Sequence, residues 1–174
     1  MRLVNAFSDS LRQIGNYGYV AETAVLRPTK DRPLYSLLYC TRRKEGIEVF
    51  RECQIAALEE QSKTRATVKI GHAETTTGQG EIFQSLHEMG PDDLLNYLQS
   101  EREAATSRIL ELTPAQPNAI QYDQLWPLIL ARNVVKRVDV NKIVARLRNE
   151  KKLLIPDWEK NRRVPQDGYR VQRA

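Results

Sequence analysis

The sequence has few of the residues on which metal and redox sites depend. Its 174 residues include two cysteines and two histidines. Cys40 and Cys53 are thirteen positions apart, whereas a redox pair needs two cysteines three positions apart and a zinc site needs closely spaced pairs. His72 and His87 do not complete such a set. We therefore expect no metal ion and no cofactor, and we expect both cysteines to pack as small apolar side chains.

Long apolar runs are also absent. No stretch approaches the roughly 20 apolar residues of a membrane span, and the first residues, MRLVNAFSDSLRQIG, are too polar for a signal peptide. We expect a cytoplasmic protein without membrane contacts. The sequence also shows no acid–base pair and no nucleophile beside a base, which argues against an independent hydrolase.

Charge is distributed unevenly along the chain. Residues 1–113 carry 14 Lys and Arg against 16 Asp and Glu, a net charge of -2, and residues 114–174 carry 13 against 6, a net charge of +7. This asymmetry indicates a polyanionic partner for the C-terminal third. The stretch PAQPN at 114–118 coincides with the change of charge, so we place a domain boundary there.

Apolar periodicity predicts the elements of the first two thirds of the chain. They are a helix at 7–14, strands at 19–26 and 34–41, a helix at 46–61, a loop at 69–80, a short strand or turn at 83–87 and a helix at 91–112. The connection between the two strands is too short for a parallel crossover, so they should form an antiparallel pair. The second strand is apolar nearly throughout, which indicates that both of its faces are covered.

The C-terminal third has the element order of a winged helix-turn-helix. Helices are predicted at 121–132 and 140–151, the second with Asp139 as its N-cap, followed by a strand at 153–158, a loop at 159–168 and a strand at 169–172. The expected core side chains of this unit are Leu125, Ile143, Val144, Leu147, Leu154 and Trp158.

The helix at 140–151 separates an apolar stripe from a cationic face. Lys142, Arg146 and Asn149 recur at helical spacing on that face. In winged-helix folds such a helix can enter the major groove while the following loop reaches the backbone. The alternative is a solvated surface or a protein-contact surface. The candidate nucleic-acid contacts are Asn141, Lys142, Arg146, Arg148, Asn149, Lys152, Lys160, Arg162 and Arg163.

Two stretches, RPLYSLLYCTRRKEGIEVFRE and LWPLILARNVVKRVDVNKIVARLRNEKKLLIPDW, resemble the C-terminal portion of the three-Cys-motif partner protein family. The clearest element is an aromatic-rich strand ending in Thr41 and Arg42, followed by Gly46, Ile47 and a helix. The resemblance implies an α+β chain in which the C-terminal edge of a Rossmann-like methyltransferase sheet, an antiparallel hairpin plus helices, precedes a winged helix-turn-helix domain. The implied segments are a methyltransferase-like fragment at 1–62, a linker and helical connector at 63–113 and the winged helix-turn-helix domain at 114–174.

The resemblance also bears on activity. In the methyltransferase-like domain a Gly-rich loop after the first strand holds the methyl donor, whereas GNYGYV at 15–20 precedes a strand and GQG at 78–80 follows no strong strand. We therefore expect a non-catalytic interaction module whose partner is double-stranded DNA, a three-Cys-motif protein or a missing methyltransferase-like fragment. Self-association through an exposed apolar edge of residues 1–60 is a further expectation. The alternative function is a subunit of a split methyltransferase-like enzyme.

Overall fold

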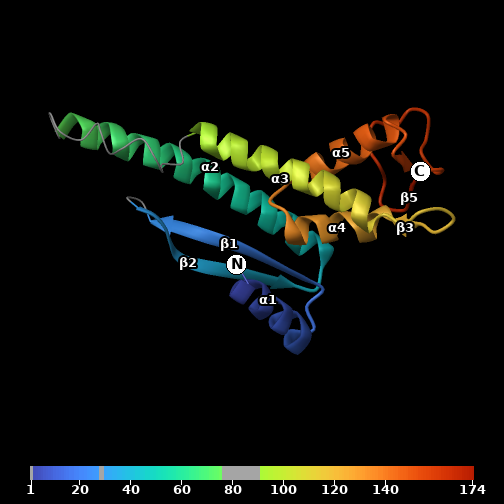
Figure 1. The fold of residues 1–174 in the computed structure, drawn as a ribbon, viewed down its shortest axis with the longest axis horizontal. Helices are drawn as coiled ribbons and strands as arrows, with labels where there is room; N and C mark the ends of the chain where they lie inside the picture. Colours follow the sequence, from blue (N-terminus) through green and yellow to red (C-terminus); the bar gives the residue numbers. More distant parts are fainter. Residues whose placement is uncertain (1, 28–29, 76–90) are drawn as a thin grey trace.

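Long helices and two small antiparallel sheets make up the chain (Figure 1). The computed structural model describes residues 2–27, 30–75 and 91–174. The first part holds α1 (Arg2–Gly15), β1 (Tyr19–Arg27), β2 (Lys30–Thr41) and α2 (Lys44–Thr75). The second holds α3 (Pro91–Leu112), β3 (Ile120–Gln121), α4 (Tyr122–Arg132), α5 (Arg137–Asn149), β4 (Leu153–Leu154) and β5 (Arg170–Arg173). The predicted α+β class is confirmed.

Strands β1 and β2 form the predicted antiparallel hairpin. The hairpin lies between α1 on one side and α2 on the other (Figure 1). Tyr39 of β2 stacks on Phe50 of α2, with the ring centroids 4.6 Å apart. The second strand was predicted to be covered on both faces. This prediction is wrong for the first part of the predicted strand, where Tyr35 and Leu37 are exposed. Neither strand pairs with a further strand among the described residues, so the edge of a larger sheet stays a prediction.

Helix α2 is longer than its predicted range of 46–61. The predicted loop at 69–80 is wrong for residues 69–75, which are helical. Adding a residue to an existing helix costs far less free energy than nucleating a new helix. The polar residues 69–75 therefore extend the helix whose first half is packed against the rest of the protein. The predicted segment at 83–87 lies outside the described residues. Cys53 is exposed, against expectation, because it lies about 200° around the helix from the buried Ile55.

The C-terminal elements follow the order α3, β3, α4, α5, β4, β5, and β5 lies between β3 and β4 in the sheet. Helix α5 begins at Arg137, so Asp139 is in its first turn and is not the predicted N-cap. The Asp139 carboxylate instead accepts the backbone N–H of Lys136 at 3.1 Å. The predicted strand at 153–158 ends at Leu154, and Pro156 has no N–H with which to extend the ladder.

One hydrophobic cluster joins the two parts of the chain. Ala21 and Ile47 belong to it together with Ala105 and Ile109 of α3. The predicted core positions are confirmed for Leu125, Ile143, Val144 and Leu147, and Trp158 packs against the cluster half-buried. Leu154 is a wrong prediction because its side chain is 42% exposed, whereas that of Leu153 is 2% exposed. Successive residues of a strand point to opposite faces, and Leu153 takes the inner face.

Arg51 of α2 is a buried cation at the centre of this junction, with 2% of its surface exposed. Its guanidinium donates to the carbonyls of Leu130 at 2.6 Å and Ala131 at 3.2 Å. Both carbonyls belong to the last turn of α4, where no further helical N–H is present to bond them. It also donates to the carbonyl of Glu22 in β1 and to the side chain of Gln54. Burial lowers the pKa of Arg51 to about 10, which leaves it charged at neutral pH.

Substituting Leu147 tests the assigned core face of α5. Leu147→Ala should lower the free energy of unfolding by about 2–5 kcal/mol, since truncating a buried leucine loses burial and leaves a cavity. Leu154→Ala is the matched control and should change the free energy by no more than about 0.5 kcal/mol at its exposed position. Urea unfolding measures both variants. Equal effects would show that the two leucines are equally buried.

Substituting Arg51 tests the junction itself. Arg51→Met should lower the free energy of unfolding by at least about 2 kcal/mol, because each buried carbonyl left without a donor costs about 1–3 kcal/mol. Arg51→Lys keeps the charge but not the planar set of donors, so its unfolding free energy should be intermediate. Denaturant unfolding followed by circular dichroism gives the order. A Met variant as stable as the wild type would show that desolvation of the guanidinium offsets its hydrogen bonds.

Candidate nucleic-acid interface

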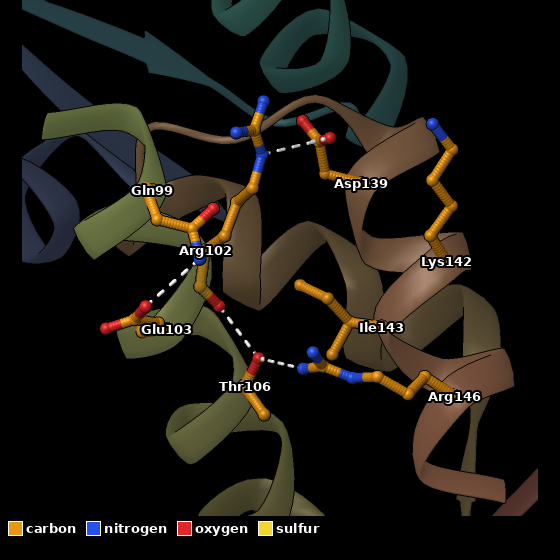
Figure 2. Close-up of a pocket in the computed structure, with 8 residues that line it drawn as sticks. All are labelled: Gln99, Arg102, Glu103, Thr106, Asp139, Lys142, Ile143 and Arg146. Atoms are coloured by element: carbon orange, nitrogen blue, oxygen red, sulfur yellow. Dashed lines mark hydrogen bonds and ion pairs between the residues drawn. The ribbon is translucent and has the colours of Figure 1, made fainter. Parts of the chain in front are cut away.

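One flank of α5 faces α3 across an open groove of about 320 Å³ (Figure 2). Residues at helical spacing line it from both sides. In Figure 2 the side chain of Arg146 crosses the groove and donates to the Thr106 hydroxyl at 3.1 Å, and Arg102 Nε lies 3.3 Å from Asp139 Oδ1. Ile143 provides an apolar patch between them. We call this space the α3–α5 groove, and its lining residues are Gln99, Arg102, Glu103, Thr106, Asp139, Lys142, Ile143 and Arg146.

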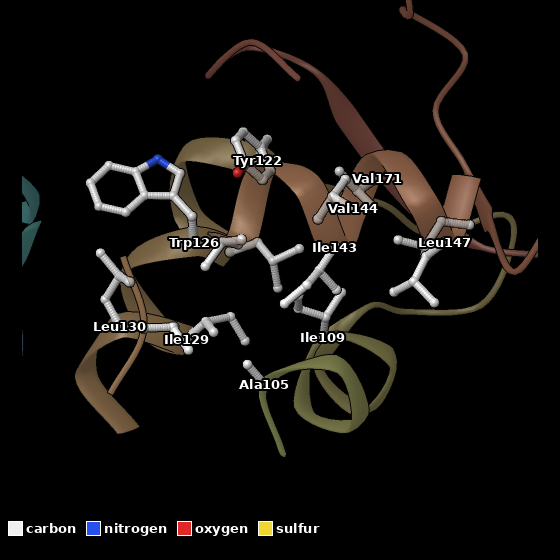
Figure 3. Close-up of a cluster of buried hydrophobic side chains, with 14 of the residues drawn as sticks. Ala105, Ile109, Tyr122, Trp126, Ile129, Leu130, Ile143, Val144, Leu147 and Val171 are labelled. Atoms are coloured by element: carbon white, nitrogen blue, oxygen red, sulfur yellow. The ribbon is translucent and has the colours of Figure 1, made fainter. Parts of the chain in front are cut away.

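The buried face of α5 fixes the orientation of the helix. Val144 and Leu147 point into the hydrophobic cluster with Ile109 of α3 and Val171 of β5 (Figure 3). Close packing of this kind leaves one rotational setting for the helix, because interior side chains interdigitate with few voids. The positions outside the apolar stripe are therefore held at the surface. Lys142, Arg146 and Asn149 are exposed as a consequence.

The second flank of α5 contacts the β4–β5 loop, residues 155–169. The Arg148 guanidinium carbon lies 4.6 Å from the centroid of the Trp158 ring. Trp158 also donates its indole N–H to the carbonyl of Arg162 at 3.0 Å, which fixes the course of the loop. Arg146 and Arg148 are two positions apart and hence about 200° apart around the helix. The loop and α3 therefore flank α5 on opposite sides.

The predicted cationic side chains differ in their ion pairs. Arg162 pairs with Glu159 at 3.2 Å, and Arg146 and Lys152 share Glu150 at 3.8 and 2.8 Å. The hydrogen bond from Lys152 holds the pKa of Glu150 below its usual range. In the described part of the chain no ion pair engages the exposed side chains of Lys142, Lys160 and Arg163. These three residues carry the charges that are most available to a ligand.

Two polar members of the predicted set have partners inside the protein. Asn141 is half-buried, and its side-chain oxygen accepts a hydrogen bond from the hydroxyl of Tyr122. Burial raises the pKa of Tyr122, so the hydroxyl keeps its proton and remains a donor. Asn149 is exposed and accepts a hydrogen bond from Arg148 at 3.4 Å. Asn141 thus joins α5 to α4, whereas Asn149 lies at the surface beside the cations.

A second charge cluster, which the sequence did not indicate, surrounds Trp126 of α4. The guanidinium of Arg137 lies 4.4 Å from the Trp126 ring centroid, and Lys44 Nζ lies 5.9 Å from it. The indole N–H donates to Asp167 at the end of the β4–β5 loop. Arg137 also bonds Asp167 and reaches Glu48 at 3.3 Å. The cluster therefore fixes the base of the loop to α2, α4 and α5.

Lys44 holds this cluster to the N-terminal part of the chain. Its ammonium group lies 3.1 Å from Asp123 and 3.2 Å from Asp167. Partial burial disfavours the charge of Lys44, but the hydrogen bonds to the two carboxylates outweigh burial and raise its pKa. These residues are separated by up to 123 positions, so no local pattern could have predicted their contact.

The contribution of α3 was also missed, because residues 63–113 read as a connector. Glu101 accepts the backbone N–H of Val134 at 2.8 Å and so holds the turn between α4 and α5. Arg102 and Thr106 line the groove beside it. The four-residue spacing of Arg102 and Thr106 places both on one helical face, and this was the available sequence signal.

No group of three or more His, Cys, Asp or Glu side chains in residues 2–27, 30–75 and 91–174 could hold a metal ion. None of the helices in those ranges is long and apolar enough to cross a membrane. Exposed ammonium and guanidinium groups on α5 and its neighbouring loop donate hydrogen bonds and carry positive charge, which suits phosphate oxygens.

The Asp157–Arg170 pair should make stability depend on acid pH. Hydrogen bonds from the side chain and the backbone of Arg170 lower the pKa of Asp157 from 3.8 to about 2. Because the folded pKa is the lower one, the pair should stabilise the fold above about pH 4 and lose that effect as pH falls through about 2. Asp157→Asn should thus be less stable than the wild type at pH 6, with the difference shrinking toward pH 2. Thermal unfolding across this range measures it.

Glu159→Gln is the control for removing a loop carboxylate in that experiment, because the Glu159 side chain forms an exposed ion pair with Arg162 and no other ion pair with a described residue. A stability difference for Asp157→Asn that is the same at pH 6 and pH 2 would contradict the assigned role of the pair.

Comparisons of the chain with protein-family models, with curated proteins and with solved structures found no match.

Proposed function

We propose that α3 to β5 form a winged helix-turn-helix module that binds a nucleic-acid duplex through α5 and the β4–β5 loop. The element order and the position of β5 between β3 and β4 support this architecture. In this proposal α3 is the first helix of the module, so the module begins before residue 114. Helix α5 then occupies the position of the helix that enters the major groove.

The observation that carries the proposal is the contact between Arg148 and Trp158. It holds the basic loop against α5, so the exposed charges of Lys142 on the helix and of Lys160 and Arg163 on the loop belong to neighbouring elements. Residues 137–173 hold 11 Lys and Arg against 5 Asp and Glu, a net charge of +6. A duplex carries one negative charge per roughly 1.7 Å of its axis, so it offers a matching row of anions.

The resemblance to three-Cys-motif partner proteins adds a second partner to the proposal. Within the described residues, β1 and β2 pair only with each other, which leaves the outer edge of each strand free of a ladder. A separate methyltransferase-like chain or a second copy could add strands there, since unpaired edges are templates for pairing. The protein would act in the cytoplasm as a non-catalytic interaction module. The alternative is a subunit of a split methyltransferase-like enzyme.

Salt dependence tests nucleic-acid binding. For a labelled DNA duplex the logarithm of the binding constant should fall linearly with the logarithm of salt concentration, with a slope of about -0.9 per phosphate neutralised. Replacing both Arg162 and Arg163 by Ala should reduce that slope by up to about two units. Arg163 should account for most of the change, because Arg162 already pairs with Glu159. Fluorescence anisotropy at several salt concentrations measures the slopes.

The matched control removes two charges elsewhere. Arg43 directly precedes α2 and Lys63 lies within it, and both side chains are exposed, so replacing both by Ala lowers the net charge equally. This control should keep the wild-type slope. Equal slopes for the wild type and the loop variant would reject nucleic-acid reading by this module and would favour a protein partner.

A further inference from the structure

The α3–α5 groove has more free hydrogen-bond donors than free acceptors. Both oxygens of Asp139 are engaged, one by Arg102 and the other by the backbone N–H of Lys136. Glu103 accepts from Gln99 at 3.0 Å through Oε1, so Oε2 is the one carboxylate oxygen of the groove lining without a partner among the described residues. Among the described residues, the terminal nitrogens of Arg102 and the ammonium group of Lys142 have no hydrogen-bonding partner. Figure 2 shows Lys142 extending from α5 without a bond to the other residues that line the groove. A ligand for this groove therefore needs to supply acceptors.

The charge of the groove is matched to a single negative charge. Arg102, Lys142 and Arg146 supply three positive charges, and the carboxylates of Asp139 and Glu103 supply two negative charges, so the lining carries +1. A phosphodiester is a monoanion with two free oxygens. The ion pair with Asp139 orients Arg102 through Nε, which leaves the two terminal nitrogens of its planar fork to bond such oxygens.

We propose that the α3–α5 groove binds a backbone phosphate of the same duplex that α5 and the β4–β5 loop contact, with Arg102 of α3 as the principal ligand. The inference rests on the function proposed above. It adds a phosphate site on the flank of α5 opposite the loop, because Arg146 reaches α3 whereas Arg148 reaches Trp158. The two sites thus lie on the two sides of the helix.

The two phosphate-binding sites on opposite flanks of α5 indicate whether the partner is a B-form DNA duplex or an A-form RNA duplex. An α-helix with its side chains is about 10–12 Å wide, and the major groove of B-form DNA is about 12 Å wide, so a helix in that groove has a backbone on each side. The major groove of an A-form RNA duplex is too narrow for side chains to read. The partner is accordingly B-form DNA, held by the loop on one backbone and by the α3–α5 groove on the other.

The experiment compares salt slopes for a DNA duplex, using full-length wild-type protein and Arg102→Gln. The slope should become shallower by about 0.9, the value for one phosphate contact. Combining Arg102→Gln with the replacement of Arg162 and Arg163 should add the two reductions, since the sites are on opposite flanks. Arg108→Gln, on the same helix but outside the groove lining, is the matched control and should keep the wild-type slope.

Lys142→Gln is the second test variant, because its exposed side chain makes no ion pair with a described residue and its loss should leave the fold intact. It should reduce the slope as Arg102→Gln does. Circular dichroism and melting temperatures verify the fold of each variant. An RNA duplex of the same sequence should bind more weakly, with a slope that Arg102→Gln leaves unchanged; equal binding of RNA would overturn the assignment to B-form DNA.

The failures of the two proposals are distinguishable. Wild-type slopes for both Arg102→Gln and Lys142→Gln, beside a shallower slope for the loop variant, would overturn the phosphate site and leave the proposed function intact. No binding of either duplex by the wild type would overturn both. Inorganic phosphate, compared with chloride at equal ionic strength, provides the last arm. If phosphate raises the melting temperature of the wild type but not of Arg102→Gln while the DNA slopes agree, the groove binds free anions only and the backbone assignment is wrong.

Discussion

The buried charge of Arg51 constrains how the two parts of the chain are joined. A guanidinium removed from water must find acceptors for its donors, because an unpaired buried charge is prohibitively costly. Arg51 finds them in the carbonyls of Leu130 and Ala131, which the end of α4 leaves without helical partners. The N–H groups of the buried guanidinium and the carbonyls at the end of α4 would both lack partners, and here they bond each other. The contact sets the position of α2 against α4, and a single hydrophobic cluster forms across the junction.

The positions of α5 and the β4–β5 loop follow from this junction. Lys44 begins α2, and its bonds to Asp123 and Asp167 join the N-terminal part to α4 and to the end of the loop. The Trp126 ring lies against Lys44 and against Arg137, which is at the start of α5. The base of the loop is consequently held by partly buried charges, while Lys160 and Arg163 stay exposed farther along it. Lys and Arg side chains therefore stabilise the fold at the base of the β4–β5 loop. Farther along the loop, side chains of the same two types remain available to a ligand.

Local sequence patterns predicted most of the helices and strands, but they did not predict which side chains of the short strands are buried. The apolar stripe of α5 was readable because Val140, Ile143, Val144 and Leu147 recur at helical spacing, and the hairpin was readable because its connection is short. Strand β4 has only two residues, so it contains no repeated apolar spacing from which its inner face could be read. For that reason the sequence could not decide that Leu153, and not Leu154, faces inward.

The sequence by itself determined the α+β class, the antiparallel hairpin, the core face of α5 and the concentration of positive charge in the last third. All of these depend on neighbouring residues or on simple sums. Only the tertiary structure decided which charges are already paired: Arg51 donates to two carbonyls at the end of α4, Arg102 pairs with Asp139, and Lys44 pairs with Asp167. The physical reason is that the partner of a charge is set by packing between elements that are distant in the chain, and spacing along the sequence does not encode that distance.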